Sequence, residues 1–269
     1  MGLVRTRMSR LLGSVAVAAV LGLTLAGCKT TGDDVTGSIG NPVAPRTDAD
    51  WRRSLDVWGQ RYKEDPGNAE AAINYAKALR ATEQRAQAVA VLEQASLRHP
   101  HDMPLLGAYG RALADAGDYA QALNVLDRAH TPDNPDWRIL NAQGAVLDQL
   151  GRHSEAQGHY SAALKIVPDE PSILSNLGLS YALSKDLKRA EATLRRAVAL
   201  PNAAPKVRQN LALVVGLQGR FAEAEKIAAT DLPANEATAN IDYLRTMLAQ
   251  QGDLKKSGRK QLPAPDTGT

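Results

Sequence analysis

Small residues and large apolar residues each recur every 34 positions along most of this 269-residue chain. Two of the recurring positions are always small, and a third, four residues after the second, is large and apolar. The first small series is Ala76, Gly110, Gly144, Gly178 and Ala212. The second is Ala88, Ala122, Ala156, Ala190 and Ala224, and the large series is Leu92, Leu126, Tyr160 and Leu194. This period indicates a chain built by stacking one small structural unit, each copy burying its apolar face against its neighbours.

Each unit is predicted to be two antiparallel helices. Within residues 137–170, Leu140, Gly144 and Leu147 are spaced by four and three, which places them on one helical face. A second helix presents Tyr160 in the same manner, and the glycine allows the two backbones to approach closely. Glycines 117, 151 and 219 fall between the two helices of their units, where a helix end often needs a positive φ.

The pattern resembles that of the tetratricopeptide repeat (TPR). It predicts an all-α, right-handed superhelical solenoid over about residues 50–250, with no sheet. The predicted repeats are 69–102, 103–136, 137–170, 171–204 and a degenerate fifth at 205–233. A leading half repeat is expected at 50–68 and a capping helix at 234–250. The fifth repeat departs from the pattern at Arg208 and Asp231, and terminal repeats are expected to be atypical because one face meets water.

The first 27 residues are predicted to be a lipoprotein signal peptide. They carry three arginines among the first ten positions, continue with an apolar stretch too short to span a bilayer, and lead into Cys28 through the sequence LAGC. Cys28 is the only cysteine in the chain, which fits lipid attachment and excludes an intramolecular disulfide. The alternative is an ordinary signal peptide with an incidental cysteine. Residues 28–49, rich in Gly, Thr, Asp and Pro, are expected to be a flexible tether.

The charge of the chain does not indicate a nucleic-acid partner. Removing residues 1–27 takes three arginines from the 32 basic residues, which leaves 29 basic and 29 acidic residues. The pI near 9.0 therefore belongs to the precursor. Residues 251–269 are expected to be a basic, disordered tail carrying Lys255, Lys256, Arg259 and Lys260.

The sequence holds no convincing catalytic or metal-binding pattern. His99 and His101 alternate in a predicted turn, but a metal ion would need further ligands, and turn histidines are usually solvated. There is no G-x-S-x-G motif, and the glycines of TTGDDVTGSIG lack the strand and helix of a phosphate-binding loop. The prediction is a non-enzymatic protein that needs no cofactor, no metal and no small-molecule substrate.

A protein partner is expected on the first helices of the repeats, which line the concave face of such solenoids. Asn74, Asn176 and Asn210 share one repeat position, and their amides can pair with both backbone groups of an extended peptide. Lys77 and Arg111, three residues further on, share another. The remaining candidates are Arg80, Arg138, Asn141 and Gln209. Alternatively, the asparagines belong to the repeat pattern and bond to the neighbouring helix.

The chain as a whole resembles a more specific family. The lipobox LAGC, the tether TTGDDVTGSIG, and segments such as DWRRSLDVWGQRY and DWRILNAQGAVLDQLGRHSEA are similar to TadD-type TPR lipoproteins of the tight-adherence (Tad/Flp) pilus machinery. The resemblance implies a palmitoylated outer-membrane lipoprotein that faces the periplasm and assists pilus assembly, as a pilotin for the outer-membrane secretin. Lys29 after the lipidated cysteine implies the outer membrane. The alternative is a periplasmic TPR adaptor for cell-wall enzymes or for another outer-membrane assembly complex.

Overall fold

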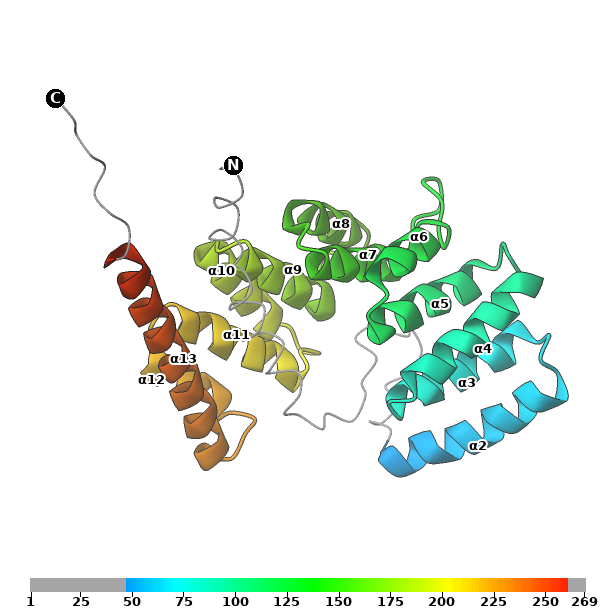
Figure 1. Ribbon diagram of the computed structural model, residues 1–269, viewed down its shortest axis with the longest axis horizontal. Helices are drawn as coiled ribbons and strands as arrows, with labels where there is room; N and C mark the ends of the chain where they lie inside the picture. Colours follow the sequence, from blue (N-terminus) through cyan, green and yellow to red (C-terminus); the bar gives the residue numbers. More distant parts are fainter. Residues whose placement is uncertain (1–46, 261–269) are drawn as a thin grey trace, which may run out of the picture.

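The computed structural model describes the backbone of residues 47–260 and the side chains of residues 47–251. Within these residues the chain is entirely helical, apart from turns and one isolated bridge between Thr131 and Asn134 (Figure 1). The helices are α2 (Asp48–Glu64), α3 (Ala69–Ala81), α4 (Arg85–Arg98), α5 (Met103–Ala116), α6 (Tyr119–Asp127), α7 (Trp137–Gln149), α8 (His153–Ile166), α9 (Pro171–Leu183), α10 (Leu187–Val198), α11 (Pro205–Leu217), α12 (Phe221–Ala228) and α13 (Ala234–Lys260). The predicted all-helical solenoid is therefore confirmed for this part of the chain. The signal peptide, Cys28 and almost all of the tether lie outside the described residues.

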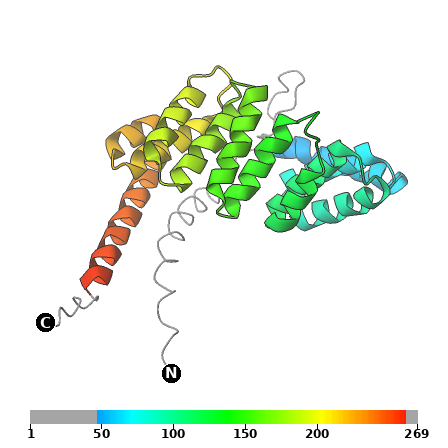
Figure 2. The same cartoon turned by 90° about the horizontal axis from the view of Figure 1, so that it is seen from above.

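The helices stack in pairs along one direction, as both views of the molecule show (Figures 1 and 2). The odd-numbered helices α3, α5, α7, α9 and α11 are the first helices of the five repeats, and each packs against the next. The even-numbered helices α4 to α12 are the second helices, and each packs between the two first helices that flank it in sequence. A continuous row of first helices results, and this row is where the sequence placed the binding residues.

The close contact predicted between the two helices of each repeat is present. A Cβ atom added to Gly144 would lie 2.6 Å from the ring of Tyr160, a separation that real side chains do not adopt. The equivalent additions at Gly110 and Gly178 would lie 2.5 Å from Leu126 and 2.6 Å from Leu194. The small residue on the first helix is thus required because the large residue on the second helix fills the same space.

The turn between the two helices of a repeat needs a left-handed backbone at one fixed position. The residues at this position are Glu83, Gly117, Gly151, Lys185 and Gly219, with φ values of 62°, 89°, 74°, 69° and 82°. Glycine adopts this conformation without steric cost, whereas a side chain costs about 1–2 kcal/mol. The glycines in the turns thus have the backbone role that the sequence predicted, and repeats 1 and 4 accept a side chain at the same place.

The two ends of the array differ in how they are closed. At the N-terminal end α2 takes the place of a second helix and packs on α3. At the C-terminal end α13 packs on both α11 and α12, as the first helix of another repeat would. The sequence predicted a cap that ends at residue 250 and a disordered tail after it, but α13 continues to Lys260 and projects from the array (Figures 1 and 2). A helix of strong helix formers such as Leu, Lys and Arg tolerates the two glycines in this stretch. None of the described helices is long and apolar enough to cross a membrane.

Candidate protein-binding surface

Three polar contacts between neighbouring first helices join residues that are 35 positions apart in the sequence. Arg80 Nε donates to Asp115 Oδ2 at 2.5 Å between α3 and α5. Asn176 Nδ2 donates to Asn141 Oδ1 at 3.0 Å between α9 and α7. Asn210 Nδ2 donates to the Ser175 hydroxyl at 2.9 Å between α11 and α9. Because one repeat has 34 residues, each contact joins a residue to the neighbour of its equivalent in the next repeat. Polar side chains therefore run along the row of first helices.

The three asparagines that share a repeat position are used in two ways. Asn176 and Asn210 bond to the preceding first helix, which is the alternative that the sequence left open. Asn74 instead donates to the carbonyl of Glu70 on its own helix at 3.0 Å. All three remain partly exposed, whereas Asn141 is only 2% exposed. The two contacts fix one N–H of Asn176 and one N–H of Asn210, and with them the orientation of each amide.

The predicted cations of the row are engaged with other groups. Arg80 pairs with Asp115, which is itself partly exposed. The Arg138 guanidinium lies 4.5 Å from the centre of the Trp137 ring and 3.9 Å from Asp136. Lys77 and Arg111 are partly exposed and also interact with other groups of the chain. Gln209 is partly exposed beside Asn210 on α11. The structure thus pairs Asn176 with Asn141 and Asn210 with Ser175 in the C-terminal part of the row. It leaves Asn74, with the cations of α3 and α5, in the N-terminal part.

A buried carboxylate that sequence reasoning missed joins repeats 3 and 4. Asp148 accepts hydrogen bonds from His153 Nδ1 at 2.8 Å, from the Tyr160 hydroxyl at 3.1 Å and from the Ser180 hydroxyl at 2.8 Å. Burial raises the pKa of Asp148, while the three hydrogen bonds act in the opposite direction. Burial also raises the pKa of Tyr160 well above its usual value. The sequence did contain a signal for a buried polar partner. Tyr160 stands where other repeats have leucine, and a buried tyrosine hydroxyl needs a hydrogen-bond partner.

Asp148, His153 and Ser180 are the residue types of a catalytic triad, but they are not arranged in space as a triad. A nucleophilic serine needs a histidine that takes its proton and a carboxylate behind that histidine. Here Ser180 and His153 both bond to the same oxygen of Asp148, so the carboxylate lies between them. The geometry joins α7, α8 and α9 and does not activate a hydroxyl. Among the described residues no three His, Cys, Asp or Glu side chains could hold a metal ion.

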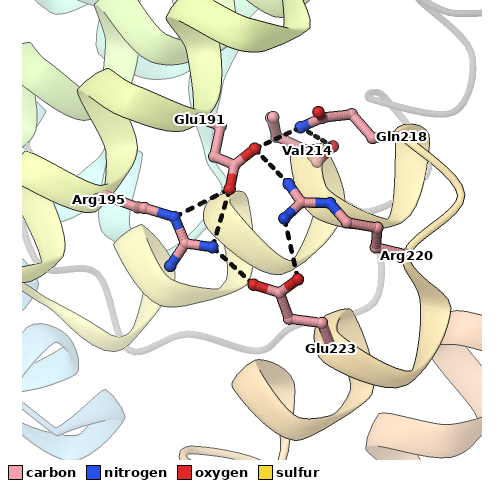
Figure 3. A network of polar contacts seen from close by, with 6 residues as sticks. All are labelled: Glu191, Arg195, Val214, Gln218, Arg220 and Glu223. Carbon is pink, nitrogen blue, oxygen red and sulfur yellow. Dashed lines mark hydrogen bonds and ion pairs between the residues drawn. The ribbon is translucent and has the colours of Figure 1, made fainter.

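Repeats 4 and 5 are joined by charges nearer the surface (Figure 3). Glu191 on α10 accepts from Arg195 at 2.9 Å, from Gln218 at 2.8 Å and from Arg220. Glu223 on α12 pairs with Arg195 at 2.6 Å and with Arg220 at 2.9 Å, which closes a ring of four charges. Three of the four side chains are more than a third exposed, and only Glu191 is largely buried.

The two departures of the fifth repeat compensate each other. Arg208 Nε and Nη2 each lie 2.6 Å from an oxygen of Asp231, a bidentate pair between α11 and the turn after α12. The pairing also raises the pKa of the Arg208 guanidinium. The sequence showed both residues as irregular but did not show that they meet.

Comparison with known proteins identifies the repeat. Three family models described as tetratricopeptide repeat match residues 59–109, 103–128 and 141–205. No curated protein matches the chain significantly.

Solved structures share the solenoid at low sequence identity. A structure titled "Crystal structure of PilW, widely conserved type IV pilus biogenesis factor" aligns with a TM-score of 0.62 and 15% identity, over 86% of this chain and 99% of that one. Human IFIT1 aligns with a TM-score of 0.59 and 18% identity, over 77% of this chain and 52% of that one. A chain of the APC/C hetero-tetramer Cut9–Hcn1 aligns with a TM-score of 0.58 and 17% identity, over 73% of this chain and 43% of that one. At these identities the likeness concerns the fold.

Proposed function

We propose that this solenoid of tetratricopeptide repeats is a non-enzymatic assembly factor that holds an extended segment of a protein partner along its row of first helices. The proposed partner is the outer-membrane secretin of a Tad/Flp pilus, for which the protein acts as a pilotin. In this proposal a lipid on Cys28 anchors the protein in the outer membrane, facing the periplasm.

The observation that carries the proposal is the pair of asparagine amides held between α7, α9 and α11. Asn141 holds Asn176 and Ser175 holds Asn210 in fixed orientations, so little side-chain entropy remains to be lost when a peptide binds. Each has a second N–H and a carbonyl oxygen, which match the acceptor and donor of a peptide unit. Neighbouring helices pack about 8–10 Å apart, and three residues of extended chain span about 10 Å. The two asparagines would therefore meet peptide groups about three residues apart.

The choice of a pilus partner is supported by sequence and by fold together. The lipobox, the tether and the repeat segments resemble TadD-type lipoproteins over the whole chain. A solved structure described as a type IV pilus biogenesis factor shares the solenoid over 86% of this chain. The fold is therefore compatible with a role in pilus assembly, and the sequence resemblance directs the proposal to the Tad/Flp apparatus.

The contact surface is tested with the double variant Asn176→Ala, Asn210→Ala. Losing two hydrogen bonds of about 0.5–1.5 kcal/mol each should weaken partner binding roughly five- to a hundred-fold. Asn124→Ala is the matched control, because Asn124 is an exposed asparagine on the second helix α6. In cells, the double variant at normal protein level should lower the amount of secretin multimer, and the control should not. Unchanged multimers would exclude these asparagines as the contact.

The anchor is tested separately with Cys28→Ser. Several acyl chains at about 0.8 kcal/mol per buried CH₂ make attachment effectively permanent, so the serine variant should leave the membrane fraction or accumulate as uncleaved precursor. A processed serine variant that still sediments with membranes would refute the anchor. If deletion of the whole protein leaves both secretin multimers and pili unchanged, the pilus proposal fails and the cell-wall adaptor replaces it.

A further inference from the structure

Three polar side chains, one buried and two partly buried, stand between repeats 2 and 3 where most other repeats have apolar residues. Gln143 stands at a repeat position occupied by Tyr75, Tyr109, Leu177 and Leu211. His159 stands where other repeats have Val91, Val125, Thr193 and Ile227. His130 stands where later repeats have Leu164, Val198 and Leu232. Replacing three positions at the same joint breaks a pattern that the other repeats largely keep.

Each of the three polar groups has a buried atom that lacks a hydrogen-bond partner within the described residues. These atoms are His130 Nδ1, His159 Nδ1 and Gln143 Oε1. Gln143 is only 2% exposed, and its Nε2 donates to Asp127 Oδ1 at 2.8 Å. A buried polar atom without a partner costs about 1–3 kcal/mol. The joint is therefore less stable than it would be with the residues that the other repeats use.

The repeat is also less regular at this point. The second helix of repeat 2, α6, has 9 residues, whereas α4 and α8 have 14. The chain after α6 forms the irregular segment 128–136 before α7 begins. The buried apolar residues of α3 to α6 form one cluster and those of α8 belong to another, with α7 contributing to both. One face of α7 thus packs with repeats 1 and 2 and its other face packs with α8, so α7 lies at the joint between the two clusters.

The charges around His159 come from both sides of the joint between repeats 2 and 3. Asp127 at the end of α6 and Glu155 on α8 favour the charged imidazole, whereas His130 after α6 and Arg152 before α8 disfavour it. Burial is the largest influence, and it lowers the pKa of His159. A proton on His159 is therefore more costly when the joint is closed than when water reaches the ring.

We propose that His130, Gln143 and His159 form an acid-sensitive joint between repeats 2 and 3. The joint is closed while the His159 ring is neutral. A proton on His159 places a cation in a site with unpartnered polar atoms and a second histidine, and the segment 128–136 then separates from α8. Because the row of first helices crosses this joint, opening changes the angle between the N-terminal and C-terminal parts of the row.

The direction of the pH effect follows from the lowered pKa. In the open joint the ring titrates near the usual value of about 6.5. Below that pH the open joint binds more protons than the closed one, so acid favours opening. The opening equilibrium should rise by up to about tenfold for each pH unit, for one additional proton, until the closed joint is also protonated.

Hydrogen–deuterium exchange of the full mature chain tests the joint. At pH 7.5 and 5.0, with exchange times adjusted for the intrinsic pH dependence, peptides covering residues 123–143 should show more opening in acid. His159→Val, which introduces the residue of repeats 1 and 2, should abolish the rise. The control His101→Gln, at an exposed histidine, should keep it. A wild-type chain without the rise, or a His159→Val chain that retains it, overturns the proposal.

A second measurement does not depend on the variants' stability. The imidazole signals of the wild-type chain, followed by NMR between pH 8 and 5, should show His159 titrating below 6.5 together with shifts in the segment 128–136. A ring that titrates at or above 6.5 would overturn the joint whatever the variants do.

Discussion

Two joints in the same solenoid connect neighbouring repeats by different kinds of polar interaction. Between repeats 3 and 4, one buried carboxylate, Asp148, gathers three donors from α8 and α9. Between repeats 4 and 5, two glutamates and two arginines form a largely exposed ring. Buried hydrogen bonds are costly to break because their partners are left unsatisfied, whereas exposed ion pairs contribute little and are screened by salt. Of these two joints, the one between repeats 4 and 5 should therefore lose less stability when its polar contacts are removed.

The largest loss in the free energy of unfolding is expected from Asp148→Ala. The substitution leaves the hydroxyls of Tyr160 and Ser180 and the ring of His153 without their common acceptor. At about 1–3 kcal/mol for each unsatisfied buried group, the free energy of unfolding should fall by about 3 kcal/mol or more. Urea denaturation gives the value. A loss below about 1 kcal/mol would show that the buried joint is no stronger than the exposed one.

The next largest effect is expected from Gly144→Leu. Even a Cβ atom at this position would meet the Tyr160 ring, so the leucine must push α8 away from α7. Overpacking of this kind costs about 1–3 kcal/mol or more. Because Tyr160 also donates to Asp148, the loss should be less than additive with that of Tyr160→Phe. A variant that melts at the wild-type temperature would contradict the assigned helix contact.

A smaller loss is expected from Asp231→Ala in the fifth repeat. Arg208 would lose a bidentate partner but remains partly exposed, so water can replace part of the interaction. The expected decrease in the free energy of unfolding is about 1–2 kcal/mol. Arg208→Leu combined with Asp231→Ala restores the repeat pattern and should recover most of the loss. If the double variant is as unstable as the single one, the two residues do not compensate each other.

The smallest effect should come from Glu223→Gln, which removes an exposed carboxylate of the ring. An exposed network of this kind contributes about 1 kcal/mol or less, and raising the salt from 0.05 to 1 M should reduce the difference from wild type. Asp148→Ala measured at the same two salt concentrations should show little change. Equal salt dependence for the two variants would remove the distinction between the joints.

The repeat architecture could be predicted because its signals are periodic. The positions of Gly144 and Tyr160 predicted their contact, and the glycines between helices predicted the turns. The polar joints could not be predicted in the same way, because Asp148 lies at a helix end with no motif around it. Tyr160, Gln143 and His159 break the pattern and so mark the joints, but a sequence does not show which partner each one meets. Asn176 illustrates the limit, since an amide suits a neighbouring helix and a bound peptide equally well.

The central claim is that the row of first helices is the surface that holds the partner. Site-specific photo-crosslinking in cells tests it directly, with benzoylphenylalanine placed at Gln209 on the row and at Asn124 on the second helix α6 as the matched exposed position. The account predicts an adduct with the secretin from position 209 and none from position 124. No adduct from position 209 at normal protein level, or equal adducts from both positions, would contradict it.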